Sequence, residues 1–279
     1  MTARMMLQCP VCGALLTETE RAFACANRHS FDRSRYGYVN LLQRQTKKLR
    51  GDDAEMVRAR RDFLDGGYYQ PLLDAILAEV SEESKPVRRI ADIGCGEGWY
   101  SCNLLRKLTA DGNSAVLSGF DISPDALRYA CVRSREAGLD AQTVWAVSSV
   151  NRLPLPDESA DLALNLFAPC FPSEFARILR QGGLLLRAVP LQCHLWELKT
   201  ALYDAPYENR PVLEAPEGFS LEKLREIRFR FTVQGDALTH LFAMTPYAHK
   251  TAAVDIKKLY QIDGLTVQAE FGLLCCRKQ

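Results

Sequence analysis

The sequence of 279 residues lacks any hydrophobic run long enough to span a bilayer, which excludes a membrane-spanning protein and predicts no membrane partner. Residues 1–9 also hold too short an apolar core for a signal peptide. With no export signal, ten cysteines are typical of a reducing compartment, so we expect a cytoplasmic protein. The content of hydrophobic (47%) and charged (25%) residues suits a globular chain, long enough for one α/β domain and a small module.

Net charge is also nearly absent, at +1, but this value hides an asymmetry along the chain. Residues 1–50 carry nine Lys or Arg and three Asp or Glu, a balance of +6, whereas the remainder has a balance of −5. A basic segment on an acidic body is typical of a nucleic-acid-binding protein that grips phosphate with one part of its surface. The alternative is a solvated basic surface with no partner.

Histidine is scarce, with four in the chain, yet one of them completes a zinc-ligand pattern near the N-terminus. The pattern consists of Cys9, Cys12, Cys25 and His29, separated by two, twelve and three residues. Zn²⁺ binds four such ligands in a tetrahedron, and two short knuckles from one segment provide them. Because protein atoms fill all four positions, we expect one structural Zn²⁺ with no open site for chemistry. Unrelated buried thiols are the alternative.

The most informative stretch is residues 92–98, Asp-Ile-Gly-Cys-Gly-Glu-Gly, which lies between an expected strand and an expected helix. Its glycines are Gly94, Gly96 and Gly98. Glycine permits positive φ and lets the backbone approach a ligand where a Cβ would collide. In an open α/β sheet such a turn lies at the carboxyl ends of the strands, where ligands bind.

Two features of this turn favour S-adenosylmethionine (SAM) over a dinucleotide. The third glycine comes one position earlier than in the dinucleotide pattern, and Glu97 faces the place where a pyrophosphate would sit. An acidic residue there suits a cofactor with positive charge. Asp92 closes the first strand, and Asp121, 23 residues after Gly98, closes the second and can accept hydrogen bonds from ribose hydroxyls. NAD or a purely structural turn is the alternative.

Downstream of the turn, apolar strand patterns alternate with helical ones. The expected strands lie near 88–93, 115–121, 143–148, 161–167, 183–189, 228–233 and 265–275. This order predicts an α/β fold of the Rossmann-like class I methyltransferase type, with a mostly parallel seven-stranded sheet and helices on both faces. We divide the chain into a zinc-binding module (1–42), a basic linker and helix (43–68) and a SAM-dependent methyltransferase domain (69–279).

Several continuous segments resemble the RlmA-type 23S rRNA (guanine-N1-)-methyltransferases, which carry an N-terminal zinc ribbon. The segments are 9–12, 28–32, 36–42, 51–56, 59–72 and 194–199. The resemblance covers nearly the whole chain, and it implies methyl transfer from SAM to N1 of a guanine in a 23S rRNA hairpin. It also implies that the zinc module helps to hold the hairpin, and that Tyr69, the glycine turn and His194 contact the cofactor.

The loop after the fourth expected strand, Asn165-Leu-Phe-Ala-Pro-Cys, departs from the family pattern. That strand ends beside the methyl group in this fold, so we expect Asn165 and the backbone carbonyls up to Pro169 to line the reaction site. Guanine N1 must lose a proton as it attacks, and a polar acceptor near the base helps. No histidine or carboxylate in the loop is an obvious base, although Asp161 and Glu174 flank it. The target base must be flipped or looped out.

Two other functions stay open on sequence grounds. One is a class I methyltransferase acting on a small molecule, with an incidental zinc module. The other is a non-catalytic zinc-ribbon RNA-binding protein, which the intact set of glycines and strand-end aspartates argues against. Individual residues also have structural alternatives: Tyr69 packing in the core, His194 capping a helix, and Arg60 and Arg61 forming a solvated helix face. Assembly as a homodimer is left open.

Overall fold

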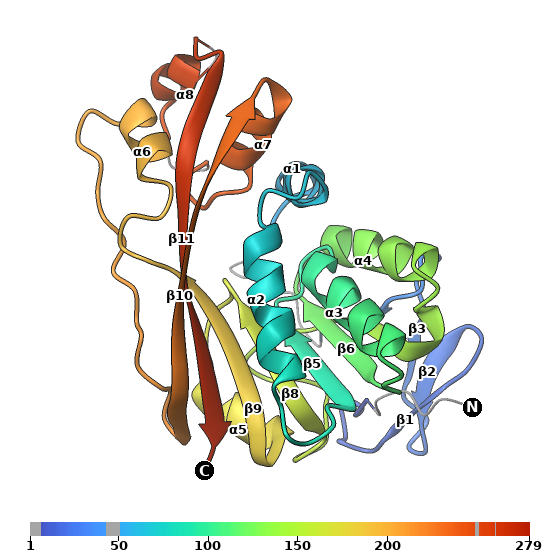
Figure 1. Ribbon diagram of the computed structural model, residues 1–279. Helices are drawn as coiled ribbons and strands as arrows, with labels where there is room; N and C mark the ends of the chain where they lie inside the picture. Colours follow the sequence, from blue (N-terminus) through green and yellow to red (C-terminus); the bar gives the residue numbers. More distant parts are fainter. Residues whose placement is uncertain (1–6, 43–50, 249–250, 260) are drawn as a thin grey trace.

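The protein is described by a computed structural model that covers residues 7–42, 51–248, 251–259 and 261–279. Its large sheet has the strand order β10-β11-β9-β8-β5-β6-β7-β4. These strands are β4 (Val39–Asn40), β5 (Arg89–Ile93), β6 (Val116–Asp121), β7 (Thr143–Val147), β8 (Ala160–Leu166), β9 (Leu179–Pro190), β10 (Phe219–Gln234) and β11 (Gly264–Lys278). All neighbouring pairs are parallel except β9 with β11 and β10 with β11. The expected class I methyltransferase fold is confirmed (Figure 1).

Helices precede, connect and follow the strands of the parallel part of the sheet, and two more lie between the last two strands. The helices are α1 (Ala54–Asp65), α2 (Gln70–Ser81), α3 (Trp99–Ala110), α4 (Pro124–Glu136), α5 (Pro172–Ile178), α6 (Trp196–Leu202), α7 (Asp236–Ala243), α8 (Ala253–Leu259) and the short 3₁₀ helix η1 (Asp140–Gln142). Helix α1 begins where the Asp53 side chain accepts hydrogen bonds from the N–H groups of Glu55 and Met56. Within the described residues, no helix is both long and apolar enough to cross a bilayer.

The sheet has eight strands, where the sequence analysis expected seven. The extra strand, β4, comes from the N-terminal module and pairs with β7, with Val39 opposite Ala146 and Asn40 opposite Val147. The pairing continues through the N–H of Leu41, which donates to the Val147 carbonyl at 3.0 Å. An edge strand presents unpaired backbone groups, and β4 covers those of β7. A strand of two residues has no readable alternation, which is why the sequence pattern did not reveal it.

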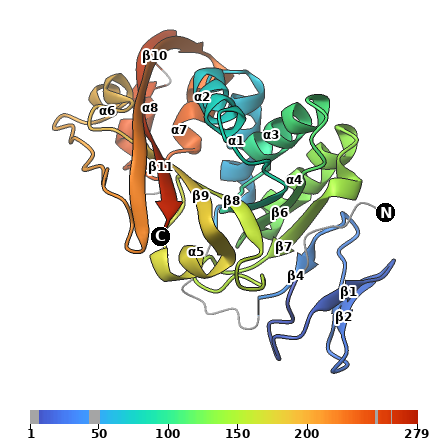
Figure 2. The ribbon, with the colours of Figure 1, turned by 60° about the horizontal axis from the view of Figure 1, so that its bottom comes forward.

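The two faces of the sheet are covered differently. One face packs against helices including α2, α3 and α4, through alternate strand residues such as Leu117 and Leu162. The other face packs against α5 and the N-terminal module, so that Phe23 of the module shares a hydrophobic cluster with Phe120 of β6 and Phe175 of α5. Figure 2 shows the module beside β4 and β7. The module therefore does part of the covering that helices alone were expected to do.

The N-terminal module contains a three-stranded antiparallel sheet of β1 (Leu16–Glu18), β2 (Ala22–Cys25) and β3 (Ser30–Asp32). The Gln8 N–H donates to the Pro154 carbonyl at 2.9 Å, a second backbone link to the large domain. Most of the expected basic linker, residues 43–50, lies outside the described residues. The described part of the module, 7–42, holds only four of the nine basic residues counted above. The division at residues 42 and 68 stays a prediction.

Candidate active site and metal site

The glycine turn after β5 is bonded to the end of β6. The N–H groups of Gly94 and Cys95 both donate to the Phe120 carbonyl, at 2.8 and 3.0 Å. The N–H of Gly96 donates to the Asp121 carboxylate at 2.9 Å. These bonds bring the two predicted strand-end acids, Asp92 and Asp121, to one edge of the sheet, as parallel pairing of β5 and β6 requires.

The glycines of the turn meet different surroundings. A Cβ on Gly94 would lie 2.4 Å from the Ala168 Cβ, so the loop after β8 packs directly on the turn. A Cβ on Gly98 would lie 3.0 Å from the Ala130 Cβ of α4. At Gly96, by contrast, the nearest atom is Arg60 Nη1 at 3.8 Å. The open side of Gly96 is therefore the place where a ligand can approach the backbone closely.

The carboxyl groups at the two strand ends have raised pKa values, because burial disfavours their charged forms. Burial raises the pKa of Asp92 to about 7, against the hydrogen bond that it accepts from the Ser101 hydroxyl. Burial also raises the pKa of Asp121, while the backbone N–H groups of Ser123 and Gly96 oppose that shift. A cation bound between these groups would favour their ionised forms. The arrangement suits a sulfonium cofactor with ribose hydroxyls near Asp121.

Glu97 differs from the sequence-based interpretation. Its carboxylate does not face the open side of the turn as a free charge, because it is buried against Arg133 of α4. Arg133 Nη2 and Nε lie 2.8 and 3.0 Å from Glu97 Oε2. The electrostatic argument against a pyrophosphate is thereby weakened, since the charge is neutralised within the protein. A direct contact between Glu97 and the cofactor stays a prediction without geometric support.

Tyr69 and His194 lie together although 125 residues separate them. Tyr69 Oη is 3.4 Å from His194 Nε2, and His194 Nδ1 accepts the Glu270 N–H at 3.1 Å. Nδ1 therefore carries no proton, and burial lowers the pKa of His194 to about 3, so the ring is neutral with its proton on Nε2. Both side chains pack against Phe271, with ring-centroid distances of 5.0 and 4.6 Å. Their contact with the cofactor stays a prediction.

Tyr100, which the sequence analysis did not select, also faces this region. Its hydroxyl oxygen is one of two buried side-chain polar atoms that lack a hydrogen-bond partner within the described residues. Its ring centroid lies 6.5 Å from that of Phe167. A buried hydroxyl without a partner costs free energy, so a polar ligand group is the natural partner here. In the sequence Tyr100 stands directly after Trp99 at a helix start, and nothing distinguishes it there from a core residue.

The loop after β8 has an unusual conformation at the sheet edge. Asn165 is only 2% exposed: its Nδ2 donates to the Pro169 carbonyl at 3.2 Å, and its Oδ1 accepts from Arg187 Nε at 3.3 Å. Phe167 follows with φ of 62°, rare for a residue with a side chain, and is 46% exposed. The nitrogen and the oxygen of the Asn165 amide thus both hold the loop in shape, while the ring of Phe167 is exposed to solvent.

The two carboxylates that flank this loop in the sequence are engaged elsewhere. Asp161 accepts hydrogen bonds from the backbone N–H groups of Arg88 and Arg89 near the amino end of β8. Glu174 accepts from the Leu153 N–H and from Arg177. Neither is therefore placed to act as a general base at the carboxyl edge.

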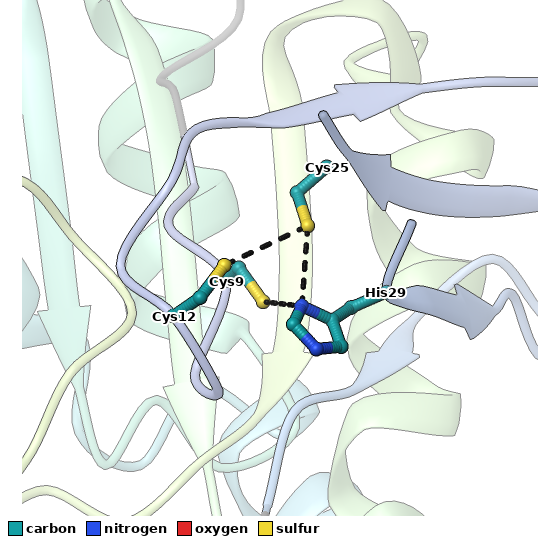
Figure 3. Close-up of side chains that lie close together, drawn as sticks. All are labelled: Cys9, Cys12, Cys25 and His29. Atoms are coloured by element: carbon teal, nitrogen blue, oxygen red, sulfur yellow. Dashed lines mark hydrogen bonds between the residues drawn. The ribbon is translucent and has the colours of Figure 1, made fainter. Parts of the chain in front are cut away.

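The four residues of the zinc pattern converge as expected (Figure 3). Cys9 Sγ and Cys25 Sγ lie 3.6 and 3.4 Å from His29 Nδ1, and Cys12 Sγ lies 3.8 Å from Cys25 Sγ. Around a tetrahedral Zn²⁺ with Zn–S bonds of about 2.3 Å, neighbouring ligand atoms are about 3.5 to 3.8 Å apart. The distances are those of the edges of such a tetrahedron, so the donor set fits zinc.

The backbone of the two knuckles supports this arrangement. Gly13 follows the first knuckle with φ of 75°, and Arg28 takes the same left-handed conformation, with φ of 64°, before His29. The Asn27 amide donates to Cys12 Sγ at 3.3 Å. Hydrogen bonds from the Ala14 backbone and from Asn27 lower the pKa of the Cys12 thiol to about 6, which favours the thiolate that zinc binds.

Comparison with known proteins decides the family. Residues 7–50 match the family described as RlmA, N-terminal, and residues 90–183 match a methyltransferase domain. Over 266 residues the chain is 37% identical to a 23S rRNA (guanine(748)-N(1))-methyltransferase of Streptomyces fradiae, which covers 93% of this chain and 91% of the relative. The chain belongs to the RlmA-type 23S rRNA (guanine-N1-)-methyltransferase family.

This RlmA-type methyltransferase is also 31% identical over 279 residues to YxjB of Bacillus subtilis (strain 168), with 96% of each chain covered. Among solved structures, that of MccD protein covers 77% of this chain and 98% of its own at a TM-score of 0.50. At 18% identity this likeness concerns the fold alone. The RlmA-type chain thus combines a SAM-dependent methyltransferase domain with a zinc ribbon whose ligands are in place.

Replacement of Cys25 by Ser, or treatment with a chelator, is expected to release zinc and to unfold β1–β3, because so small a module depends on its metal for stability. Metal analysis and hydrogen exchange measure the two effects. The matched control is Cys193→Ser, at a half-buried cysteine outside the cluster. Purified protein without zinc, or a Cys25→Ser variant that retains it, would contradict the structural role.

The affinity for SAM is expected to rise about tenfold between about pH 6 and pH 8, because the Asp92 pKa of about 7 must fall when the cationic cofactor binds. Below that pKa the carboxyl is protonated, and binding must release its proton. Calorimetry in buffers of different ionisation enthalpy counts that proton. Asp121 and Glu97 are in the same cluster, so Asp92→Asn is the control and should flatten the profile. If the SAM affinity of Asp92→Asn depended on pH as that of the wild type does, another titrating group would be responsible.

Proposed function

We propose that this protein transfers the methyl group of SAM to N1 of a guanine in a 23S rRNA hairpin, in the cytoplasm. The observation that carries the proposal is the match over nearly the whole chain to a relative with that named activity, at 37% identity. That match includes the zinc ribbon, which a methyltransferase domain alone does not need. None of the ten cysteines forms a disulfide, which is consistent with a reducing compartment.

Bound SAM supplies an electrophilic methyl group, so the protein has to align the acceptor and exclude competing nucleophiles. Guanine N1 loses its proton and gains the methyl carbon as the carbon–sulfur bond breaks, and S-adenosylhomocysteine leaves. Because Asp161 and Glu174 are engaged elsewhere, we assign the proton to water, with a loop carbonyl between Phe167 and Pro169 orienting the N–H. Asn165 acts on this step through the loop that its amide holds, and not by touching the base.

Phe167 is the side chain best placed to receive the target base. Its ring is 46% exposed beside half-buried Tyr100 and buried Phe271, at centroid distances of 6.5 and 5.4 Å. Its positive φ is an unfavourable conformation that the loop maintains, and such conformations gather at functional sites. A flipped base can stack on such a ring, because every base has an aromatic face.

The cofactor contacts belong to the same proposal. The set consists of Tyr69, Asp92, Gly94, Gly96, Glu97, Gly98, Asp121 and His194, with Tyr100 added. The open side of Gly96 and the unpartnered Tyr100 hydroxyl support it most directly. The zinc module (1–42) would hold the hairpin and residues 69–279 would carry the chemistry. A homodimer is a separate hypothesis, and light scattering of the purified protein tests it.

Incubation of 23S rRNA from a deletion strain with purified enzyme and labelled SAM is expected to give one N1-methylguanine, detected by mass spectrometry. Primer extension then locates it, because a methyl group on N1 blocks pairing and stops the polymerase. Rescue of the same stop in vivo by the wild-type gene is the control. Label on another base, or on a small molecule only, would overturn the proposed function.

Substitution of Phe167 by Leu is expected to lower kcat/KM for the rRNA hairpin about fivefold or more, because stacking on a base is worth about 1–3 kcal/mol. Phe167→Tyr keeps the ring and should retain most activity, and SAM affinity should not change in either variant. Val212→Ala, at an exposed apolar residue outside the site, is the control. Full activity of Phe167→Leu would show that the target base does not depend on stacking against this ring.

A further inference from the structure

Five side chains form a continuous row of alternating guanidinium groups and aromatic rings, here called the Arg–Tyr stripe. In order they are Arg35, Tyr36, Arg128, Tyr129 and Arg61. The distances from each guanidinium carbon to the neighbouring ring centroid are 4.8, 5.7, 4.8 and 4.7 Å along the row. Every step is within the range of a cation–π contact. Such an unbroken alternation is more than a basic helix face.

The stripe joins three segments that are far apart in the sequence. Arg35 and Tyr36 belong to the turn between β3 and β4 of the zinc module, Arg128 and Tyr129 to α4, and Arg61 to α1. Next to Arg61 in the chain, Arg60 extends its Nη1 to 3.8 Å from where a Cβ on Gly96 would lie. The stripe therefore runs from the zinc module across α4 to α1, the helix whose Arg60 approaches the cofactor turn.

The positive charges at one end of the stripe are not neutralised by the protein. Within the part of the chain that the structure describes, neither Arg35 nor Arg128 has a carboxylate at ion-pair distance, whereas Arg61 pairs with Asp62 at 2.6 Å. Arg35 Nη2 donates to Tyr36 Oη at 2.7 Å, and Arg135 Nη2 to the Tyr36 carbonyl at 2.7 Å. A guanidinium stacked on a ring keeps N–H groups along its edge that can still bind an anion. The rings thus hold the guanidinium groups in position, and those N–H groups that do not bond to tyrosine hydroxyls are left to bind an anion.

A groove of about 590 Å³ continues this surface onto the zinc module. Its lining includes four arginines, Arg21, Arg33, Arg35 and Arg135, against two acidic residues, Glu20 and Asp32. Arg33 is paired with Glu18 at 2.8 Å, so part of this charge is internal to the module. The remaining charge extends the positive surface beyond Arg35, away from the cofactor turn.

We propose that the Arg–Tyr stripe binds the sugar–phosphate backbone of the substrate RNA between the zinc module and the methyl-transfer site. This inference rests on the proposed function and names the surface through which the RNA is held. Guanidinium groups bind phosphate oxygens in bidentate fashion, and the tyrosine rings between them fix their spacing. A membrane surface would instead require an apolar face beside the cations, which the stripe does not have.

The test measures RNA binding by full-length protein carrying Arg35→Gln or Arg128→Gln. The probe is a fluorescent 23S rRNA hairpin that contains the guanine mapped above, with an unrelated hairpin of equal length beside it. Each variant is expected to bind both hairpins several-fold more weakly, because phosphate contacts position RNA without specifying its sequence. The slope of log K against log salt, from about 50 to 200 mM, should fall by about 0.7–0.9 per lost contact. SAM affinity and zinc content should not change.

Arg210→Gln is the matched control, since it removes the same charge from an exposed position in the loop between α6 and β10. It should bind RNA as the wild type does. Tyr129→Leu should weaken binding and Tyr129→Phe should weaken it less, because phenylalanine keeps the ring that contacts Arg61 and Arg128. If the wild-type protein methylates RNA and the stripe variants bind it with the affinity and salt slope of Arg210→Gln, the proposed role of the stripe is wrong and the proposed function stands. Wild-type protein that neither binds nor methylates RNA would overturn both proposals.

Discussion

The hydrogen bonds between the glycine turn and the end of β6 are the constraint on which the rest of the site depends. Two N–H groups share the Phe120 carbonyl and a third reaches Asp121, so the turn cannot move without the second strand. Because Gly94 has no Cβ, the loop after β8 can approach until Ala168 touches the turn. One set of backbone bonds thereby fixes the cofactor acids, the open side of Gly96 and the loop that presents Phe167.

The zinc module is part of the same folded body and not an appendage. Its residues Leu16 and Phe23 are buried in one hydrophobic cluster with Ile93 and Phe120, at the base of the glycine turn. β4 also extends the sheet by pairing with β7. A module of three short strands buries little apolar surface of its own, so it needs both the metal and this shared core. That dependence fixes where the module stands relative to the cofactor turn.

Local patterns in the sequence were enough to predict the zinc ligands, the glycine turn and the seven long strands, because each depends on neighbouring residues. The strand β4 escaped prediction because two residues have no period. Pairs formed only by packing escaped it as well: Arg133 pairs with Glu97 across 36 residues, which weakens the electrostatic argument against a pyrophosphate. The buried Tyr100 hydroxyl and the Arg–Tyr stripe also arise from tertiary packing, so the sequence did not reveal them. No spacing rule connects Tyr36 to Arg128, because their contact exists only after the module docks on α4.

The buried pair of Arg133 and Glu97 fixes the position of the Arg–Tyr stripe relative to the cofactor turn. Arg133 also binds Asp65 at the end of α1, at 2.8 Å, so one guanidinium ties the glycine turn to both α1 and α4. A buried ion pair adds little to the stability of the fold by itself. Separating its partners would leave an uncompensated buried charge, so the contact between Arg133 and Glu97 is firmly held. Arg61 and Arg128 stand on those same two helices. RNA held on them is thus kept at a fixed distance from the cofactor turn, and reactions between aligned groups gain most from such fixed geometry.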